Sequence, residues 1–214
     1  MKPLSKVKCE WSPHFAYIIG LIATDGNLSS DGRHIHFTSK DFELAKLFKE
    51  ILGLNNKIGK KSRGREMEKK YFVVQFGDKN FYQFLLNLGL MPNKSKILES
   101  LKIPGKYHID FLRGCLDGDG NINIFYHPES KHPQLRVRIS SASKAFLNWL
   151  KVANSKILKL KGGWIEKVRS VFILGYGIND SLKLLNLIYK DKNSPRLNRK
   201  YLKAKPFLRA QLKV

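Results

Sequence analysis

Two ten-residue segments of this 214-residue chain share a pattern that ends in an aspartate, a glycine and an asparagine. Residues 18–27 read IIGLIATDGN and residues 112–121 read LRGCLDGDGN, so the internal glycine, the aspartate and the last two residues coincide. The apolar residues of each segment fit a helix, which predicts that one helix ends at Asp25 and another at Asp119. Each aspartate is therefore expected at the carboxyl end of a helix.

That position is electrostatically poor for a carboxylate, because the carboxyl end is the negative pole of the helix dipole. Both predicted helices carry small residues four positions apart, which lets two helices approach backbone to backbone. These residues are Gly20, Thr24, Gly114 and Gly118. Such packing would bring Asp25 and Asp119 together, where each would raise the pKa of the other. A divalent cation would relieve both problems, and hard oxygen ligands facing a phosphate favour Mg²⁺. The pair suits metal-assisted hydrolysis of a phosphodiester.

The repetition extends through the whole chain. Two further pairs of segments and one dipeptide pair match in the same order, which indicates a tandem duplication. The matching pairs are residues 37–39 and 139–141, residues 85–88 and 184–187, and Asn93-Lys94 and Asn198-Arg199. The predicted domains are residues 1–104 and residues 105–214.

Each unit predicts the same α+β order, αββαββα. Alternating polar and apolar residues predict strands, and apolar residues at helical spacing predict helices. The expected elements are motif helices at 13–25 and 107–119, hairpins at 27–39 and 121–141, helices at 42–52 and 143–158, second hairpins at 57–77 and 163–176, and last helices at 79–89 and 179–190. A basic tail follows the last helix.

The charge balance restricts the partners. Lys and Arg number 40 against 17 Asp and Glu, a formal net charge of +23. The chain is 43% hydrophobic, which excludes a disordered basic tail. A folded protein this basic needs an anionic partner, and nucleic acid is the leading candidate. The sequence shows no membrane span and no secretory signal, and Cys9 and Cys115 make neither a disulfide framework nor a zinc ligand set. We expect an intracellular protein whose host, whether an organelle, a bacterium or an archaeon, stays open.

The paired motif and the duplication resemble the LAGLIDADG homing endonucleases, and within them the branch with two repeats in one chain. The resemblance spans about residues 12–205. It implies two four-stranded antiparallel sheets that form a DNA-binding saddle, and cleavage of both strands across the minor groove of a long, non-palindromic target. We also expect a monomer without an obligate protein partner. An intron-encoded gene is expected, and a free-standing gene stays open as the alternative. An RNA maturase or a non-cleaving DNA-binding protein on the same scaffold is the alternative.

The resemblance assigns the metal to Asp25 and Asp119, with the peptide carbonyls of Thr24 and Gly118 nearby. Mg²⁺ or Mn²⁺ is expected to support cleavage, and Ca²⁺ to bind without supporting it.

The resemblance also implies a basic residue near each scissile phosphate, which would hold the charge of the transition state. In the first repeat this residue is Lys94, which could also be an ordinary solvated lysine. In the second repeat it is Arg199 or Lys200, and the sequence does not separate them. Ser39 and Ser141 end the second strand of each unit, where they would order a water molecule or cap the next helix.

Polar residues alternate with apolar ones along the predicted strands, so one face of each sheet is polar. Such a face can lie in a major groove and reach bases and phosphates, or it can be an ordinary solvated face. The residues expected to contact DNA are His34, His36, Ser39, Lys60, Lys61, Arg63, Lys70, Gln75, Gln134, Arg136, Arg138, Ser141, Lys167 and Arg169.

The two motifs differ at their sixth position, which is Ala23 in the first and Asp117 in the second. This position is not the metal ligand, so the difference predicts two unlike sites rather than an inactive protein. Asp117 either supports its site indirectly or simply ends the helix.

Alternative interpretations of the same residues as other metal sites or protein classes have less support. Residues 117–121 resemble the start of an EF-hand loop, but Ile122 and Pro128 occupy the positions of the required glycine and glutamate. The pairs His34/His36 and His127/His132 lack further zinc ligands. Transcription regulators on this scaffold lack the acidic residues of the motif, so the presence of Asp25 and Asp119 favours a nuclease. An intein is disfavoured, because the sequence has no splicing-type nucleophile at its start and no His-Asn pair at its end.

Overall fold

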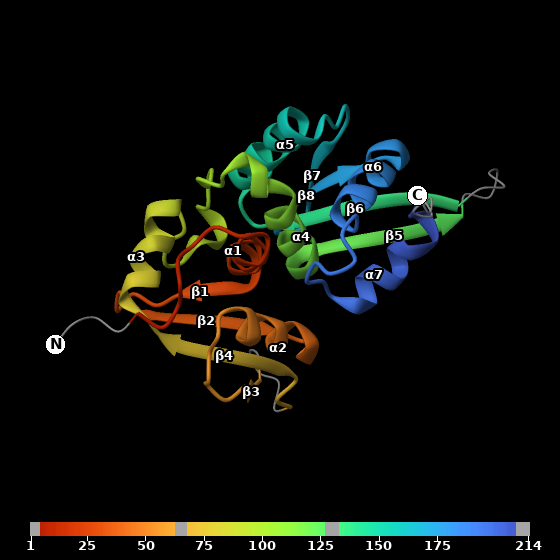
Figure 1. Cartoon of the computed structure of the whole chain (residues 1–214). Coiled ribbons are helices and arrows are strands. Elements are labelled where there is room, and N and C mark those ends of the chain that lie inside the picture. The colour runs from red at the N-terminus through yellow and green to blue at the C-terminus, as the bar shows by residue number, and fades with distance from the viewer. Residues whose placement is uncertain (1–4, 63–67, 127–132, 209–214) are drawn as a thin grey trace.

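The computed structural model describes residues 5–62, 68–126 and 133–208, and Arg63, His127 and His132 lie outside these ranges. The predicted α+β fold with two four-stranded antiparallel sheets is confirmed (Figure 1). The first unit consists of α1 (Pro13–Asp25), β1 (Gly26–Leu28), β2 (His34–Ser39), α2 (Phe42–Ile51), β3 (Gly59–Lys61), β4 (Tyr71–Gly77) and α3 (Lys79–Leu88). The second consists of α4 (His108–Asp119), β5 (Gly120–Tyr126), β6 (Pro133–Ser141), α5 (Lys144–Leu158), β7 (Trp164–Val168), β8 (Val171–Tyr176), α6 (Ile178–Ile188) and α7 (Asn198–Ala204).

The two sheets have the same topology, which reflects the duplication. Their strand orders are β1-β2-β4-β3 and β5-β6-β8-β7. Gly26 pairs with Phe37 in the first sheet, and Gly120 pairs with Ile139 in the second. Both central strands alternate between buried apolar and partly exposed polar residues, so each sheet turns one face to the helices and the other to solvent.

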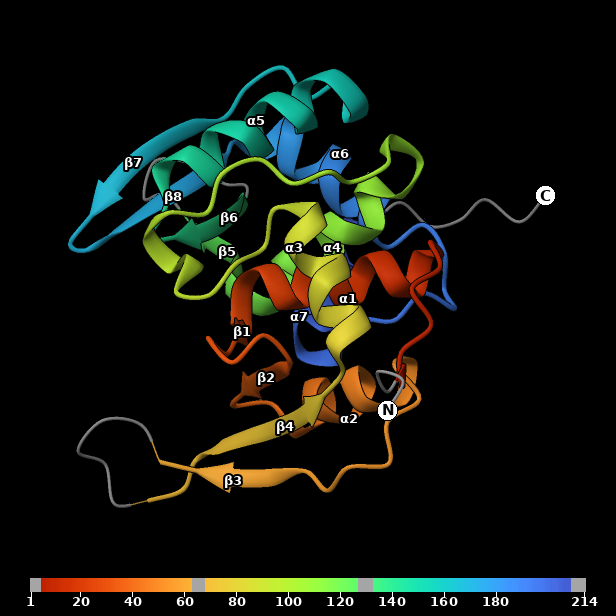
Figure 2. The same ribbon diagram turned by 90° about the vertical axis from the view of Figure 1, so that its left-hand side faces the viewer.

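Helices α1 and α4 lie side by side between the two sheets (Figures 1 and 2). A Cβ atom on Gly20 would lie 2.1 Å from the carbonyl oxygen of Phe111, and one on Gly114 would lie 2.1 Å from that of Tyr17. Only glycine permits this approach, as the small residues of the motifs predict. Cys115 also lies at this contact, with its Sγ 3.8 Å from the carbonyl oxygen of Gly20. The apolar residues of the two motifs are fully buried, namely Ile18, Leu21, Ile22, Leu112, Cys115 and Leu116.

The ends of α1 follow from local sequence. Pro13 occupies the first turn, where its missing N–H costs no helical hydrogen bond, and the Ser12 side chain accepts a hydrogen bond from the Phe15 N–H at 3.1 Å. At the other end, Gly26 has an extended backbone and begins β1 directly. Asp25 is therefore held rigidly at the junction of a helix and a strand.

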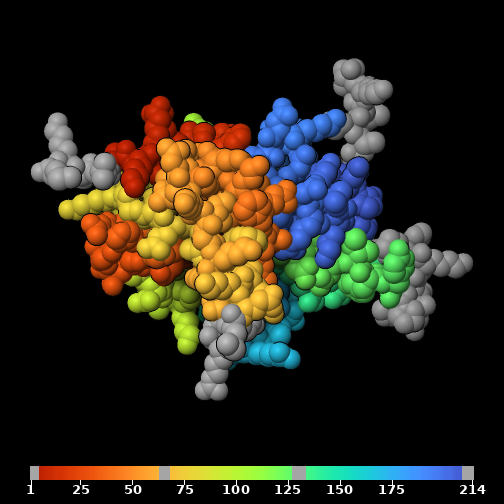
Figure 3. All heavy atoms as spheres, turned by 90° about the horizontal axis from the view of Figure 1, so that it is seen from below, coloured from red at the N-terminus to blue at the C-terminus, as the bar shows by residue number. Residues whose placement is uncertain are grey.

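The segment expected as a basic tail contains a helix, α7, that the prediction missed. Asn198 and Arg199 at its start contact Glu43 and Asp41 of the first unit. In the view of Figure 3, the orange surface of α2 meets the blue surface of α7. Three short 3-10 turns, η1 (Lys94–Lys96), η2 (Gly105–Tyr107) and η3 (Lys205–Phe207), complete the elements of the described chain.

The predicted division between residues 104 and 105 falls just before η2, in the connection between the units, and stays a prediction. Within the described ranges, no helix combines the length and apolar character needed to cross a bilayer.

Candidate active site

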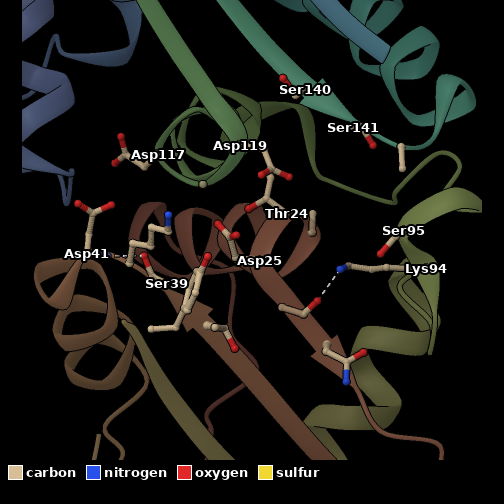
Figure 4. Close-up of a pocket in the computed structure, with 18 of the residues that line it drawn as sticks. Thr24, Asp25, Ser39, Asp41, Lys94, Ser95, Asp117, Asp119, Ser140 and Ser141 are labelled. Carbon is tan, nitrogen blue, oxygen red and sulfur yellow. Dashed lines mark hydrogen bonds between the residues drawn. The ribbon is translucent and has the colours of Figure 1, made fainter. Parts of the chain in front are cut away.

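The carboxyl ends of α1 and α4 open into a cavity of about 650 Å³ that residues from both units line. Asp25 and Asp119 lie close together at its centre, with Thr24 between them (Figure 4). A Cβ atom on Gly118 would lie 2.7 Å from Oδ2 of Asp25, which shows how closely the two helix ends approach. The structure thus brings together the four residues expected at a metal.

The electrostatics of this pair favour a cation. The pKa of the Asp25 carboxyl is raised to about 7, mainly because the group is buried and also because Asp119 lies beside it. The ammonium groups of Lys200 and Lys94 act in the opposite direction. A carboxyl group with this pKa is only partly ionised near neutral pH, and a divalent cation at the pair would favour the ionised form.

The side-chain ligands are few. In the part of the chain that the structure describes, no group of three or more His, Cys, Asp or Glu side chains is arranged to hold a metal ion. Two carboxylates with nearby carbonyls nevertheless fit Mg²⁺, which usually keeps several waters and takes substrate phosphate oxygens as ligands.

Lys94 is buried beside the cavity, with 5% of its surface exposed, so it is not a solvated surface lysine. Its Nζ donates a hydrogen bond, 2.5 Å long, to the carbonyl oxygen of Gly26, which is the residue after Asp25 (Figure 4). The pKa of Lys94 is lowered to about 8, because the effect of burial outweighs the raising effect of Asp25 and Asp119.

The two candidates of the second repeat lie in different surroundings, and which of them acts on a phosphate stays a prediction. Lys200 is 4% exposed, and its Nζ donates to the carbonyl oxygens of Leu116 at 2.6 Å, Asp117 at 2.7 Å and Gly118 at 3.1 Å. Burial lowers the pKa of Lys200 to about 8. It therefore occupies the end of α4 much as Lys94 occupies the end of α1.

The Arg199 side chain pairs with a carboxylate of the first unit instead of with the end of α4. Its Nε and Nη2 donate to the two carboxylate oxygens of Asp41, at 2.7 and 2.8 Å, and this bond raises the pKa of the guanidinium. Both residues line the central cavity, and the pair joins the two units at its mouth. Asp41 could not be recognised as a site residue from the sequence, because its partner lies in the other unit.

Ser39 and Ser141 both line the cavity, although neither is the capping residue of the next helix. The Ser39 hydroxyl accepts a hydrogen bond from the Asp41 N–H, and the Ser141 hydroxyl accepts one from the Ser143 N–H, each at 3.1 Å. Asp41 and Ser143 are themselves the N-cap residues. Each serine thus fixes the turn into a helix and keeps its hydroxyl at the cavity wall.

The polar face of the first sheet carries some of the residues expected to contact DNA. His36 pairs with Gln75 across the sheet, and Lys61 continues the same face. Lys60 alternates to the other face, where its Nζ lies 5.5 Å from the centroid of the Phe72 ring.

Two residues of this set have partners of their own. The His34 imidazole pairs with the Asp31 carboxylate, and Lys70 pairs with Glu68 at 3.1 Å.

The second sheet presents a different polar face. The Arg136 guanidinium lies between two rings, 4.7 Å from the Phe125 centroid and 5.8 Å from that of Trp164. Arg138 lies on the same face, 3.8 Å from Glu166.

The remaining residues expected on this face are less uniform. Gln134 pairs with Phe125 and shares the face of Arg136. Lys167 alternates to the opposite face, and Arg169 lies in the turn after β7.

A sequence model of the LAGLIDADG-like domain matches residues 12–89, which cover most of the first unit. No curated protein matches the sequence significantly. The fold is similar to that of I-DmoI in complex with DNA and Ca, with 18% identity and a TM-score of 0.59 over 89% of this chain and 96% of that one. It is similar to I-LtrWI bound to target DNA, a LAGLIDADG homing endonuclease, with 16% identity and a TM-score of 0.54 over 91% and 88% of the two chains.

The N-terminal LAGLIDADG domain of DUF199/WhiA is also similar, with 17% identity and a TM-score of 0.56 over 88% of each chain. At these identities the likeness establishes the fold. Together with the match in the first unit, it confirms the resemblance to the LAGLIDADG family and the arrangement of two repeats in one chain.

Proposed function

We propose that this two-repeat LAGLIDADG protein is a site-specific endonuclease that cleaves both strands of double-stranded DNA with a divalent cation. One observation carries the proposal. Asp25 and Asp119, one from each unit, share a single cavity at the ends of two helices packed backbone to backbone. Likeness to I-DmoI and I-LtrWI, whose structures contain DNA, supports DNA as the partner.

The cation would be Mg²⁺ or Mn²⁺, held by Asp25 and Asp119 with the carbonyl oxygens of Thr24 and Gly118 beside them. When bound, it supplies positive charge at the scissile phosphate and makes water more acidic. Structures of I-DmoI in complex with DNA include one with Mn and one with Ca, which supports a divalent ion in this fold.

The two buried lysines would act directly on the phosphates. Lys94 donates to one carbonyl oxygen just after α1, and Lys200 donates to three at the end of α4, so each ammonium group is held in place. Preorganised positive groups of this kind stabilise the negative charge that develops during phosphodiester hydrolysis. Lys94 would serve one strand and Lys200 the other.

The protein would act as a monomer, because one chain supplies both carboxylates and both lysines. The two polar faces differ, with histidine and glutamine on the first sheet and arginine on the second. Two sheets with different polar residues would recognise different DNA sequences in the two halves of the target, so we propose a non-palindromic target. Encoding in an intron stays a prediction.

A randomised library of long duplexes tests the proposal. The chain is incubated with the library in Mg²⁺, and the newly cut ends are captured and sequenced. We expect one non-palindromic sequence to be enriched, and EDTA to abolish the cutting. Cleavage of all sequences alike would contradict site specificity.

A non-cleaving DNA-binding protein is the second candidate, since the basic, polar sheet faces would serve it equally well. Retention of specific duplexes without any cut in Mg²⁺ or Mn²⁺ would select this candidate. Absence of both binding and cleavage would reject the two functions together.

A further inference from the structure

Asp117 is buried in the interior, with 1% of its surface exposed, although it lies near the end of its helix. Its Oδ2 accepts two hydrogen bonds, from the Tyr17 hydroxyl at 2.8 Å and from the backbone N–H of Leu197 at 2.7 Å. Tyr17 belongs to α1, and Leu197 immediately precedes α7. One carboxylate thus joins three segments that are far apart in the sequence.

Leu197 determines where α7 begins and hence where Lys200 lies. It is the N-cap residue of α7, and its carbonyl oxygen accepts a hydrogen bond from the Lys200 N–H at 3.1 Å. The Lys200 side chain then turns back onto the carbonyl oxygens at the end of α4, including that of Asp117 itself. The Asp117 side chain thus binds the residue before α7, and the Lys200 side chain of α7 binds the Asp117 carbonyl oxygen.

The first repeat holds its lysine differently. Ala23 occupies the position equivalent to Asp117, and a methyl group cannot accept a hydrogen bond. Lys94 comes from η1, after Asn93 in a left-handed conformation with φ of 54°. The two lysines therefore reach their helix ends by different routes.

We propose that Asp117 is a positioning residue that holds Lys200 at the carboxyl end of α4, and that it thereby serves the cleavage of one strand only. The strand assignment rests on the proposed function, whereas the positioning of Lys200 does not. Both hydrogen bonds use Oδ2, and Oδ1 is buried without a hydrogen-bond partner among the described residues. An asparagine would keep the accepting oxygen, but an alanine would not.

Chemical labelling of lysines tests the positioning without any DNA. A small amine-acylating reagent is added to the folded chain, and the labelling rates of Lys200 and Lys94 are measured by peptide mass spectrometry. Asp117→Ala should speed the labelling of Lys200 by at least about tenfold, because a lost buried hydrogen bond frees the segment that carries it. Lys94 is the internal control, and its rate should stay unchanged.

Two matched variants separate positioning from general loosening. Asp117→Asn should leave Lys200 protected, because the amide oxygen still accepts from Leu197. Tyr17→Phe removes the other hydrogen bond to the same carboxylate and should also leave Lys200 protected. Equal acceleration of both lysines in Asp117→Ala, or no acceleration at all, would overturn the proposal.

The strand assignment is tested on a duplex recovered from the library, with a different label on each strand. Asp117→Ala should slow the cleavage of one strand by at least about tenfold, so that nicked duplex accumulates, while the other strand is cut at the wild-type rate. Equal slowing of both strands would contradict the assignment. A wild-type chain that cuts no duplex would remove the proposed function and leave the labelling result valid.

Discussion

The contact between α1 and α4 makes a quantitative prediction for Gly20→Ala. A Cβ atom at this position would lie 2.1 Å from the Phe111 carbonyl oxygen and 2.9 Å from the Cα of Gly114. A carbon and an oxygen without a strong bond normally stay about 3.3 Å apart, so the two helices must separate by about 1 Å. Both clashing groups belong to the backbone, which cannot rotate away as a side chain would.

The expected cost follows from two opposing effects. Overpacking a tight interface costs about 1–3 kcal/mol, and the rigid backbone places this site at the upper end. Alanine has a higher helix propensity than glycine, and this difference offsets up to about 1 kcal/mol of the loss in stability. The net loss in free energy of unfolding is about 2 kcal/mol, which lowers the melting temperature of a chain this long by about 4–8 °C.

Chemical denaturation and thermal melting measure this loss, and Gly105→Ala is the matched control. The nearest atom to a Cβ on Gly105 is 3.9 Å away, so that variant should change stability by less than about 0.5 kcal/mol. The double variant Gly20→Ala/Gly114→Ala should lose less than the sum of the single losses, because the first alanine already separates the helices. Equal stability of Gly20→Ala and Gly105→Ala would refute the backbone contact.

Three further predictions concern charge. DNA affinity, measured by fluorescence anisotropy, should fall at least about a thousandfold between about 50 and 200 mM salt if several of the 40 basic residues contact phosphates, and a flat profile would argue against such contacts. Burial lowers the pKa of His108, so as the pH falls below about 6.5 this histidine is protonated in the unfolded chain before it is protonated in the folded one. The melting temperature of the wild type should therefore fall more between pH 7 and pH 5 than that of His108→Gln. Single and double alanine variants of Asp41 and Arg199 should give a coupling energy of only about 0.5–1 kcal/mol, because Arg199 is half exposed, and a coupling of zero would show that the pair does not join the units.

The repeated features of the fold could be predicted from the sequence. The glycine, aspartate and glycine of each motif fixed the helix pair and the meeting of Asp25 with Asp119, because close helix packing leaves a local pattern of small residues. Alternation along the strands likewise placed Arg136 and Arg138 on one face of the second sheet.

Contacts between distant segments that carry no matching local pattern could not be predicted. Helix α7 spans seven residues, too short for a clear amphipathic repeat, so its segment reads as a basic tail. The choice between Arg199 and Lys200 depends on helical phase, since neighbouring residues of a helix point in different directions. The role of Asp117 depends on Leu197, which lies 80 residues away in the sequence.

The most direct test of the central claim compares Asp25→Asn and Asp119→Asn with wild type on the duplex recovered from the library. If the two carboxylates act together on a divalent cation, both variants should bind the duplex with wild-type affinity in Ca²⁺ and lose cleavage in Mg²⁺. Cleavage by both variants at the wild-type rate would show that the paired aspartates do not carry the reaction.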